Sequence, residues 1–241
     1  MKSILKLTLL LFAVTDIACF VQTNLAAMRF LKRDKPPAYQ EAVTKLLLAE
    51  ANVYAAQLNL PESLPITTNT TKEIFISSPS LAERFGALGN LHTTNFSYAF
   101  GRGKHLSYIT RLIKGQNPHD YNANKPYAID PSQVNTNAAY SMATQFLAKA
   151  FVNVSQLSTS SIVSVQPWVI LHMTTSKYTV QWEREGKPVV KVVLSPPRAE
   201  LWTLRVEDPN LILRKPLEIP NLDLLLSQTN APAETDVPTK Q

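Results

Sequence analysis

The chain has 241 residues, of which 45% are hydrophobic and 17% are charged, and its formal net charge is +6. This much apolar sequence can bury a core, so the composition excludes a globally disordered chain. The chain has only 6 glycines, which argues against phosphate-binding loops, and its positive charge is spread thinly, which argues against a nucleic-acid-binding protein.

The first 27 residues have the pattern of a secretory signal peptide. Two lysines precede an apolar run over residues 7–21, which is short for a bilayer span and contains Asp16. We expect cleavage after Ala27, which would leave a periplasmic or extracellular protein without a membrane span. Two alternatives stay open: a buried N-terminal helix, and a lipid anchor on Cys19, the single cysteine.

Residues 28–114 are predicted to form a first unit, a helix followed by strands. Apolar residues at three- and four-residue spacing after two prolines predict a helix over 37–58. Further along we expect a strand over 74–76, a loop with at most one helical turn over 78–92, a half-buried strand over 96–100, a turn at 101–103 and a return strand over 106–113. Residues 115–131, rich in Asn, Pro and Asp, are predicted to be a linker.

Residues 132–226 are predicted to repeat this order as a second unit. Ser132 is expected to cap a helix whose apolar residues run from Ala139 to Phe151. Four strands follow over 162–173, 177–184, 189–194 and 200–207, with a hairpin turn at 185–187. The alternation in these strands favours an antiparallel sheet with one covered face. The polar stretch 227–241 reads as a disordered tail.

The fold class predicted from this order is α+β, with two tandem units of a helix on an antiparallel sheet. We expect Ala139, Ala143, Phe146 and Phe151 to pack on Trp182 and Trp202. Together, the segments 137–148, 178–182, 190–192 and 201–208 resemble uncharacterised exported bacterial proteins, and the order of elements is similar to PepSY-type and cystatin-like units. The resemblance implies binding rather than catalysis, and it transfers no functional residue to this chain.

The chemistry-bearing residues match no known catalytic or metal-binding motif. The four histidines (His92, His105, His119 and His172) lack metal-ligand spacing, although folding could gather the first three. Four glutamates near strand ends (Glu183, Glu185, Glu200 and Glu207) could pair as in a glycosidase, but they alternate with basic residues, which favours a solvated face. The sequence Gly-Arg-Gly-Lys at 101–104 is read as a turn, since a strand and not a helix follows.

The three tryptophans, Trp168, Trp182 and Trp202, fall on neighbouring predicted strands. On an open sheet face they would form a stacking platform for sugars or peptides, whereas facing the helix they would be core. Alternation with polar residues favours the core for Trp182 and Trp202.

These observations predict no catalytic residue, no metal site and no cofactor. The leading hypothesis is an exported, non-enzymatic module that binds or modulates an envelope protein or polymer through a sheet edge or a loop surface. The alternatives are an envelope hydrolase with an unrecognised carboxylate site and a structural protein that binds polyanions.

Overall fold

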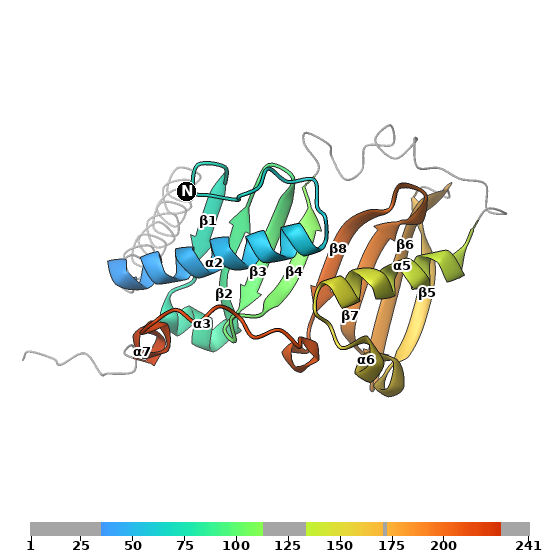
Figure 1. The fold of residues 1–241 in the computed structure, drawn as a ribbon. Coiled ribbons are helices and arrows are strands. Elements are labelled where there is room, and N and C mark those ends of the chain that lie inside the picture. The colour runs from blue at the N-terminus through green and yellow to red at the C-terminus, as the bar shows by residue number, and fades with distance from the viewer. Residues whose placement is uncertain (1–34, 113–133, 171–172, 228–241) are drawn as a thin grey trace, which may run out of the picture.

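The protein is built around one antiparallel sheet. The computed structural model describes residues 35–112, 134–170 and 173–227. The strands lie in the order β1 (Glu73–Ile76), β2 (Ala87–His92), β3 (Phe96–Gly101), β4 (Leu106–Arg111), β8 (Glu200–Val206), β7 (Lys187–Ser195), β6 (Met173–Arg184) and β5 (Ile162–Ile170) (Figure 1). All seven neighbouring pairs are antiparallel. The predicted α+β class with an antiparallel sheet is confirmed.

The central join of the sheet pairs β4 with β8. It consists of three residue pairs, including Thr110 with Thr203, whose hydroxyl oxygens lie 2.7 Å apart. The last strand of each four-strand meander therefore meets the last strand of the other. Because the sheet is continuous across this join, the first strands, β1 and β5, become its two outer edges (Figure 1).

Helix α2 (Pro37–Gln57) covers one face of the first meander, and its predicted bounds are confirmed to within one residue. Proline occupies its first turn, where a missing N–H is tolerated. Its buried stripe includes Val43, Leu46 and Leu47, which are fully buried. Tyr39 belongs to the same stripe and donates a hydrogen bond from its hydroxyl to the Ser77 carbonyl at 3.0 Å.

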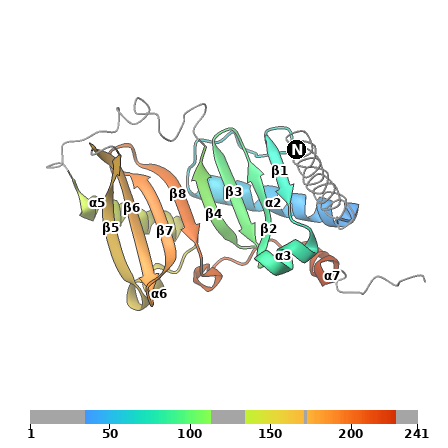
Figure 2. The ribbon, with the colours of Figure 1, turned by 180° about the vertical axis from the view of Figure 1, so that it is seen from behind.

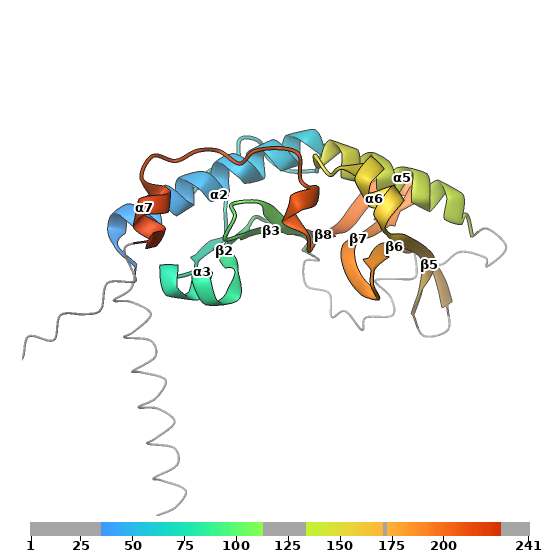
Figure 3. The same cartoon turned by 90° about the horizontal axis from the view of Figure 1, so that it is seen from below.

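Helices α5 (Thr136–Lys149) and α6 (Val154–Ser160) follow in the second half of the described chain. Helix α5 packs on β5, β6 and β7, on the same side of the sheet as α2 (Figure 3). Asn135 caps α5, since its Oδ1 accepts from the Ala138 N–H at 2.9 Å. The predicted cap at Ser132 is thus wrong: that residue lies outside the described residues, and the helix begins later.

Helix α5 packs on the sheet as predicted, through β5, β6 and β7, but the predicted contact of Phe151 with the tryptophans is wrong. Ala139 and Ala143 are fully buried, and the rings of Tyr140 and Trp182 lie 6.0 Å apart. Phe151 follows the end of α5 with a φ of 62°, and this left-handed turn directs its ring to Tyr54 of α2, at 5.9 Å. The side chain therefore connects the two helices instead of contacting the tryptophans.

Residues 78–92 form more regular structure than predicted. They contain helix α3 (Pro79–Phe85) and strand β2, where only a loop with one helical turn is expected from the sequence. Gly89 explains the discrepancy: it resembles a turn residue, yet a Cβ there would lie 2.6 Å from the Phe75 carbonyl oxygen of β1. The glycine allows the close approach of two paired strands.

The hairpin turn between β6 and β7 is confirmed. Glu185 and Gly186 have φ angles of 54° and 73°, as the two central residues of a type I′ turn require. Between β7 and β8 the chain forms a short 3₁₀ helix, η3 (Pro196–Arg198). The four strands of the second half overlap their predicted positions, except that β6 begins at Met173, four residues before its predicted start at residue 177.

After β8 the chain returns to the first half. It passes through η4 (Pro209–Leu211), then runs along α2 to helix α7 (Leu222–Ser227), which packs on α2 (Figure 1). The Leu213 N–H donates to the Phe151 carbonyl at 2.8 Å, and Glu50 of α2 accepts hydrogen bonds from Arg214 Nη1 and from the Leu217 N–H. We call residues 212–221 the return segment. It ties α2 to the end of α5.

The opposite face of the sheet is seen in Figure 2, with α2 and α5 behind the strands. Within the described ranges, no helix is long and apolar enough to cross a membrane. The predicted signal peptide over 1–27, the linker over 115–131 and all of the predicted tail except Ser227 lie outside the described residues. Ser227 itself is the last residue of α7, so the predicted start of the tail is wrong by one residue.

Candidate functional site

The fold does not bring His92 and His105 together. His92 ends β2, where its Nδ1 lies 3.6 Å from Glu73 Oε2. His105 follows the opposite end of β3, where its carbonyl accepts from the Gly101 N–H. Burial lowers the pKa of His105, because it disfavours the protonated form of the imidazole. His119 and His172 lie outside the described residues, and within them no group of three potential His, Cys, Asp or Glu metal ligands occurs.

Three of the four glutamates near strand ends have non-acidic partners, and the fourth is exposed. Glu200 Oε2 lies 3.2 Å from Arg111 Nη1, and Glu207 forms an ion pair with Arg205. Glu183 accepts a hydrogen bond from Gln181 at 2.6 Å, and Glu185 is exposed in the β6–β7 turn. These contacts are those of a charged sheet surface, and none of them resembles the facing carboxylates of a glycosidase.

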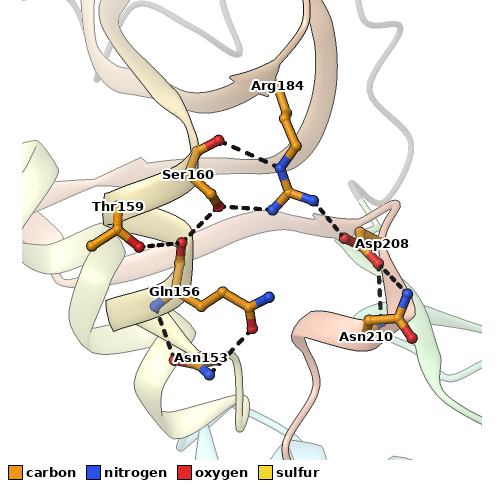
Figure 4. Close-up of polar contacts among 7 residues, drawn as sticks. All are labelled: Asn153, Gln156, Thr159, Ser160, Arg184, Asp208 and Asn210. Atoms are coloured by element: carbon orange, nitrogen blue, oxygen red, sulfur yellow. Dashed lines mark hydrogen bonds and ion pairs between the residues drawn. The ribbon is translucent and has the colours of Figure 1, made fainter.

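The end of β6 carries a dense polar cluster, drawn in Figure 4. Arg184 Nη1 lies 3.1 Å from Asp208 Oδ2, and its Nη2 donates to Ser160 Oγ at 2.9 Å. Asn153 caps α6 through a 3.0 Å bond from the Gln156 N–H. The cluster joins α6, β6 and the segment after β8. Since its groups satisfy one another, its role is structural.

The three tryptophans have different environments. Trp182 is 1% exposed and packs on Tyr140, so it belongs to the core. Trp202 is buried as predicted, and its ring is covered by Lys177, whose Nζ lies 3.4 Å from the ring centroid. Trp168 on β5 is 41% exposed, with the same Nζ at 5.1 Å. The common stacking platform does not form, because Trp182 is core while the other two rings flank one lysine.

An aromatic–cation row crosses the sheet from β5 to β3. It consists of Trp168, Lys177, Trp202, Arg111 and Phe96. The Arg111 guanidinium carbon lies 5.4 Å from the Trp202 ring and 6.0 Å from the Phe96 ring. Cations within about 6 Å of an aromatic face are attracted by the ring quadrupole. The row therefore links β5 and β6 to the central β4–β8 join.

Lys177 is the electrostatically unusual member of the row. Its side chain is only 2% exposed. Burial lowers the pKa of Lys177 to about 8, with Arg111 acting in the same direction and Glu200 opposing them. The alternation of residues 177–183 indicates a solvated face for this lysine, so sequence reasoning misses its burial. The sequence signal is the presence of tryptophans on β5 and β8, but only the fold, in which β7 separates β6 from β8, shows that both rings reach Lys177.

A small cleft of about 260 Å³ opens beside the row. Arg111 and Glu200 form part of its wall, and the rest consists of Leu58, Asn59, Leu60, Pro61, Phe146, Ala199 and Leu201. This lining contains no serine, cysteine, lysine or histidine that could act as a nucleophile. The cleft has room for a side chain, and its one carboxylate, Glu200, is paired with Arg111.

The outer edge of β5 carries the most exposed large hydrophobic side chain of the described residues, Ile162. Ile162 is 81% exposed and Val163 is 40% exposed. The strand spans nine residues, 162–170, without a charged side chain. Native edge strands are usually protected by charges, by shortness or by proline. Within the described ranges, protection of this edge comes only from Pro167 and a register shift beside Trp168, and both lie in the second half of the strand.

Every second residue in the first half of β5 directs its main-chain groups outward, away from β6. Pro167 lies opposite Tyr178 of β6, and the register is regular from there back to Ile162. Because proline has no N–H, this pair is not a hydrogen-bonded one, so the main-chain groups of Pro167 point away from β6. The orientation repeats every second residue, so the N–H and C=O groups of Val163 and Val165 also face the open side. Among the described residues, none bonds to these groups outside the sheet.

No family model matches the chain, and no match was found among curated proteins or solved structures.

Proposed function

We propose that the protein is an exported, non-enzymatic module that binds an extended segment of an envelope protein by strand addition beside β5. The observation that carries the proposal is the open first half of β5, with outward main-chain groups at Val163 and Val165 and exposed side chains at Ile162 and Val163. An extended peptide gains affinity from main-chain bonds and specificity from alternate side chains at such an edge.

The other edge of the sheet is less suited to this role. Strand β1 has only four residues and includes the charged Glu73, and the ammonium of Lys35 lies 5.2 Å from the Phe75 ring. Shortness and charge are the usual protections of an edge strand. The hydrolase alternative lacks support from the glutamate contacts, which leaves binding as the better proposal.

Two further parts of the proposal rest on the sequence. Each half of the described chain has a long helix followed by four strands, with one further short helix, α3 or α6, among them. This order fits tandem PepSY-type or cystatin-like units, and the leader fits export. The expected mature chain begins at Met28. The intact mass of the protein recovered from fractionated host cells tests this expectation. An uncut chain in the cytoplasm would contradict export. A chain that begins at a lipid-modified Cys19 would show that the exported protein is anchored to a membrane.

A displayed peptide library tests the binding site. Phage carrying random peptides are selected on the immobilised protein at low surface density, and we expect enrichment of uncharged peptides rich in β-branched residues. Replacing Ile162 by lysine places a charge on the open edge and removes an apolar contact, so the enrichment should fall about tenfold.

Phe75→Lys is the matched control, because Phe75 is also a large exposed side chain on an edge strand, 50% exposed. This variant should keep the wild-type enrichment. Equal losses in both variants, or no enriched peptides at all, would contradict strand addition at β5.

A further inference from the structure

We propose that the segment bound at this edge is β5 of a second copy of the chain, paired antiparallel about a two-fold axis at Ser164. The inference rests on the proposed function, because it names the occupant of the same edge. In this dimer the two sheets join into one continuous sheet. Because a two-fold axis perpendicular to the sheet keeps corresponding faces together, the α5 helices of both subunits lie on the same side.

The hydrogen-bonding pattern selects Ser164 as the centre. Pairing about Ser164 places Val163 opposite Val165 of the partner subunit, and by symmetry Val165 opposite Val163 of the partner subunit. All four residues direct both main-chain groups outward, so each pair can exchange two hydrogen bonds. The open half of β5 is therefore complementary to itself.

Other centres leave donors or acceptors without partners. Pairing about Gln166 or Val165 places Pro167, which has no N–H, opposite an outward-facing valine. Pairing about Val163 requires Ser161, which lies outside β5. Only the Ser164 centre uses complete pairs within the strand and ends before Pro167 and the register shift beyond it.

The side chains also suit self-pairing. Strand β5 carries no charge, so two copies place no like charges opposite each other, although the chain as a whole is cationic. Ile162, which is 81% exposed in one copy, would lie beside Gln166 of the partner subunit. Since β1 is short and charged, the second edge of each sheet stays unpaired and the assembly closes as a dimer instead of growing into a filament.

Sedimentation velocity over a wide range of protein concentration tests the inference. We expect a reversible monomer–dimer equilibrium for the wild type. Val163→Pro removes an outward N–H from each subunit and inserts a ring at the contact, so the dimer should weaken at least tenfold. Far-UV circular dichroism and thermal unfolding of the variant check that the monomer stays folded, since the inward-facing bonds of β5 are unchanged.

A charge exchange at the axis gives a second, independent test. Ser164→Lys and Ser164→Glu each place two like charges directly opposite one another, and each variant alone should dimerise several-fold more weakly than the wild type. An equimolar mixture should recover association as a mixed dimer, because opposite charges then face each other. Association of the mixture is recovered only if position 164 of one subunit faces position 164 of the other. A variant that had lost its fold would not regain association on mixing.

The outcomes separate this inference from the proposed function. A wild type that stays monomeric while β5-dependent peptides are still enriched would overturn the dimer and leave strand addition intact. A dimer that Val163→Pro does not weaken, or that the mixture does not restore, would overturn pairing at this edge. Monomeric protein without β5-dependent peptides would overturn both.

Discussion

Replacing Glu50 by alanine is expected to lower the free energy of unfolding by about 3–5 kcal/mol, as measured by chemical denaturation. Glu50 is 1% exposed on α2. Its carboxylate forms an ion pair with Arg214 and accepts the Leu217 N–H at 2.8 Å. The substitution leaves a largely buried guanidinium without its counter-charge and a main-chain N–H without its acceptor, and it detaches the return segment from α2.

Two controls separate the loss of this ion pair from a general effect of removing a glutamate. Glu73→Ala removes a carboxylate that is 67% exposed beside His92, and it should change stability little. The double variant Glu50→Leu with Arg214→Met removes both charges and should recover a large part of the loss, since an apolar pair of similar size needs no counter-charge. A cost below 1 kcal/mol for Glu50→Ala would contradict the clamp between α2 and the return segment.

Raising the pH from 8 to 10 is expected to increase the free energy of unfolding through Lys177. In the unfolded chain the ammonium keeps its proton up to the ordinary pKa of 10.5, whereas in the folded protein the pKa is lowered to about 8. Between these values the unfolded chain binds more protons, so the free energy of unfolding rises with pH, by about 2 kcal/mol over this interval. Well below pH 8 both states are protonated and this contribution is constant.

Lys177→Met is the matched variant, because it keeps the aliphatic stem between the two indole rings and removes the titrating group. Denaturation curves at several pH values should show a smaller rise for this variant than for the wild type. Burial raises the pKa of Tyr54 to about 12 and that of Tyr98 further. The raised pKa values make these tyrosines lower the free energy of unfolding only where tyrosines of the unfolded chain begin to ionise, near pH 10. The change in the free energy of unfolding between pH 8 and pH 10 therefore reports mainly on Lys177.

Equal pH profiles for the wild type and Lys177→Met would contradict the lowered pKa. That result would mean that the rings of Trp168 and Trp202, together with Glu200, stabilise the ammonium as well as water does. Either result reports how strongly the aromatic–cation row favours or disfavours the charged form of Lys177.

Local patterns in the sequence predict several elements of this fold correctly. The apolar spacing after Pro36 predicts α2, and that from Ala139 onward predicts α5, because a stripe at three- and four-residue spacing is stable only as a helix lying on a core. The sequence Glu185-Gly186 predicts the hairpin turn, because glycine readily adopts the positive φ angle that such a turn requires. Both residues do have positive φ angles in the structure. Alternation likewise predicts that Trp182 faces the covered side of the sheet. These predictions need no knowledge of distant residues.

The same local reasoning fails where a residue's neighbour is distant in sequence. Gly89 resembles a loop residue until the backbone of β1 lies against it. Lys177 belongs to an alternating polar row, and only the pairing of β5, β6, β7 and β8 brings the rings of Trp168 and Trp202 over it. Glu50 occupies a helix position like any exposed glutamate, and its partner Arg214 is 164 residues away.

The sequence by itself determines the α+β class, the two long helices, the tight hairpin and the alternating strands, because each depends on backbone preference and spacing within a few residues. It also provides the expectation of an exported protein without a known catalytic motif. The tertiary structure decides that β4 joins β8 and that β5 is left at an edge. Strand order and register arise from contacts between distant segments, and a local pattern carries no information about which distant strand it will meet.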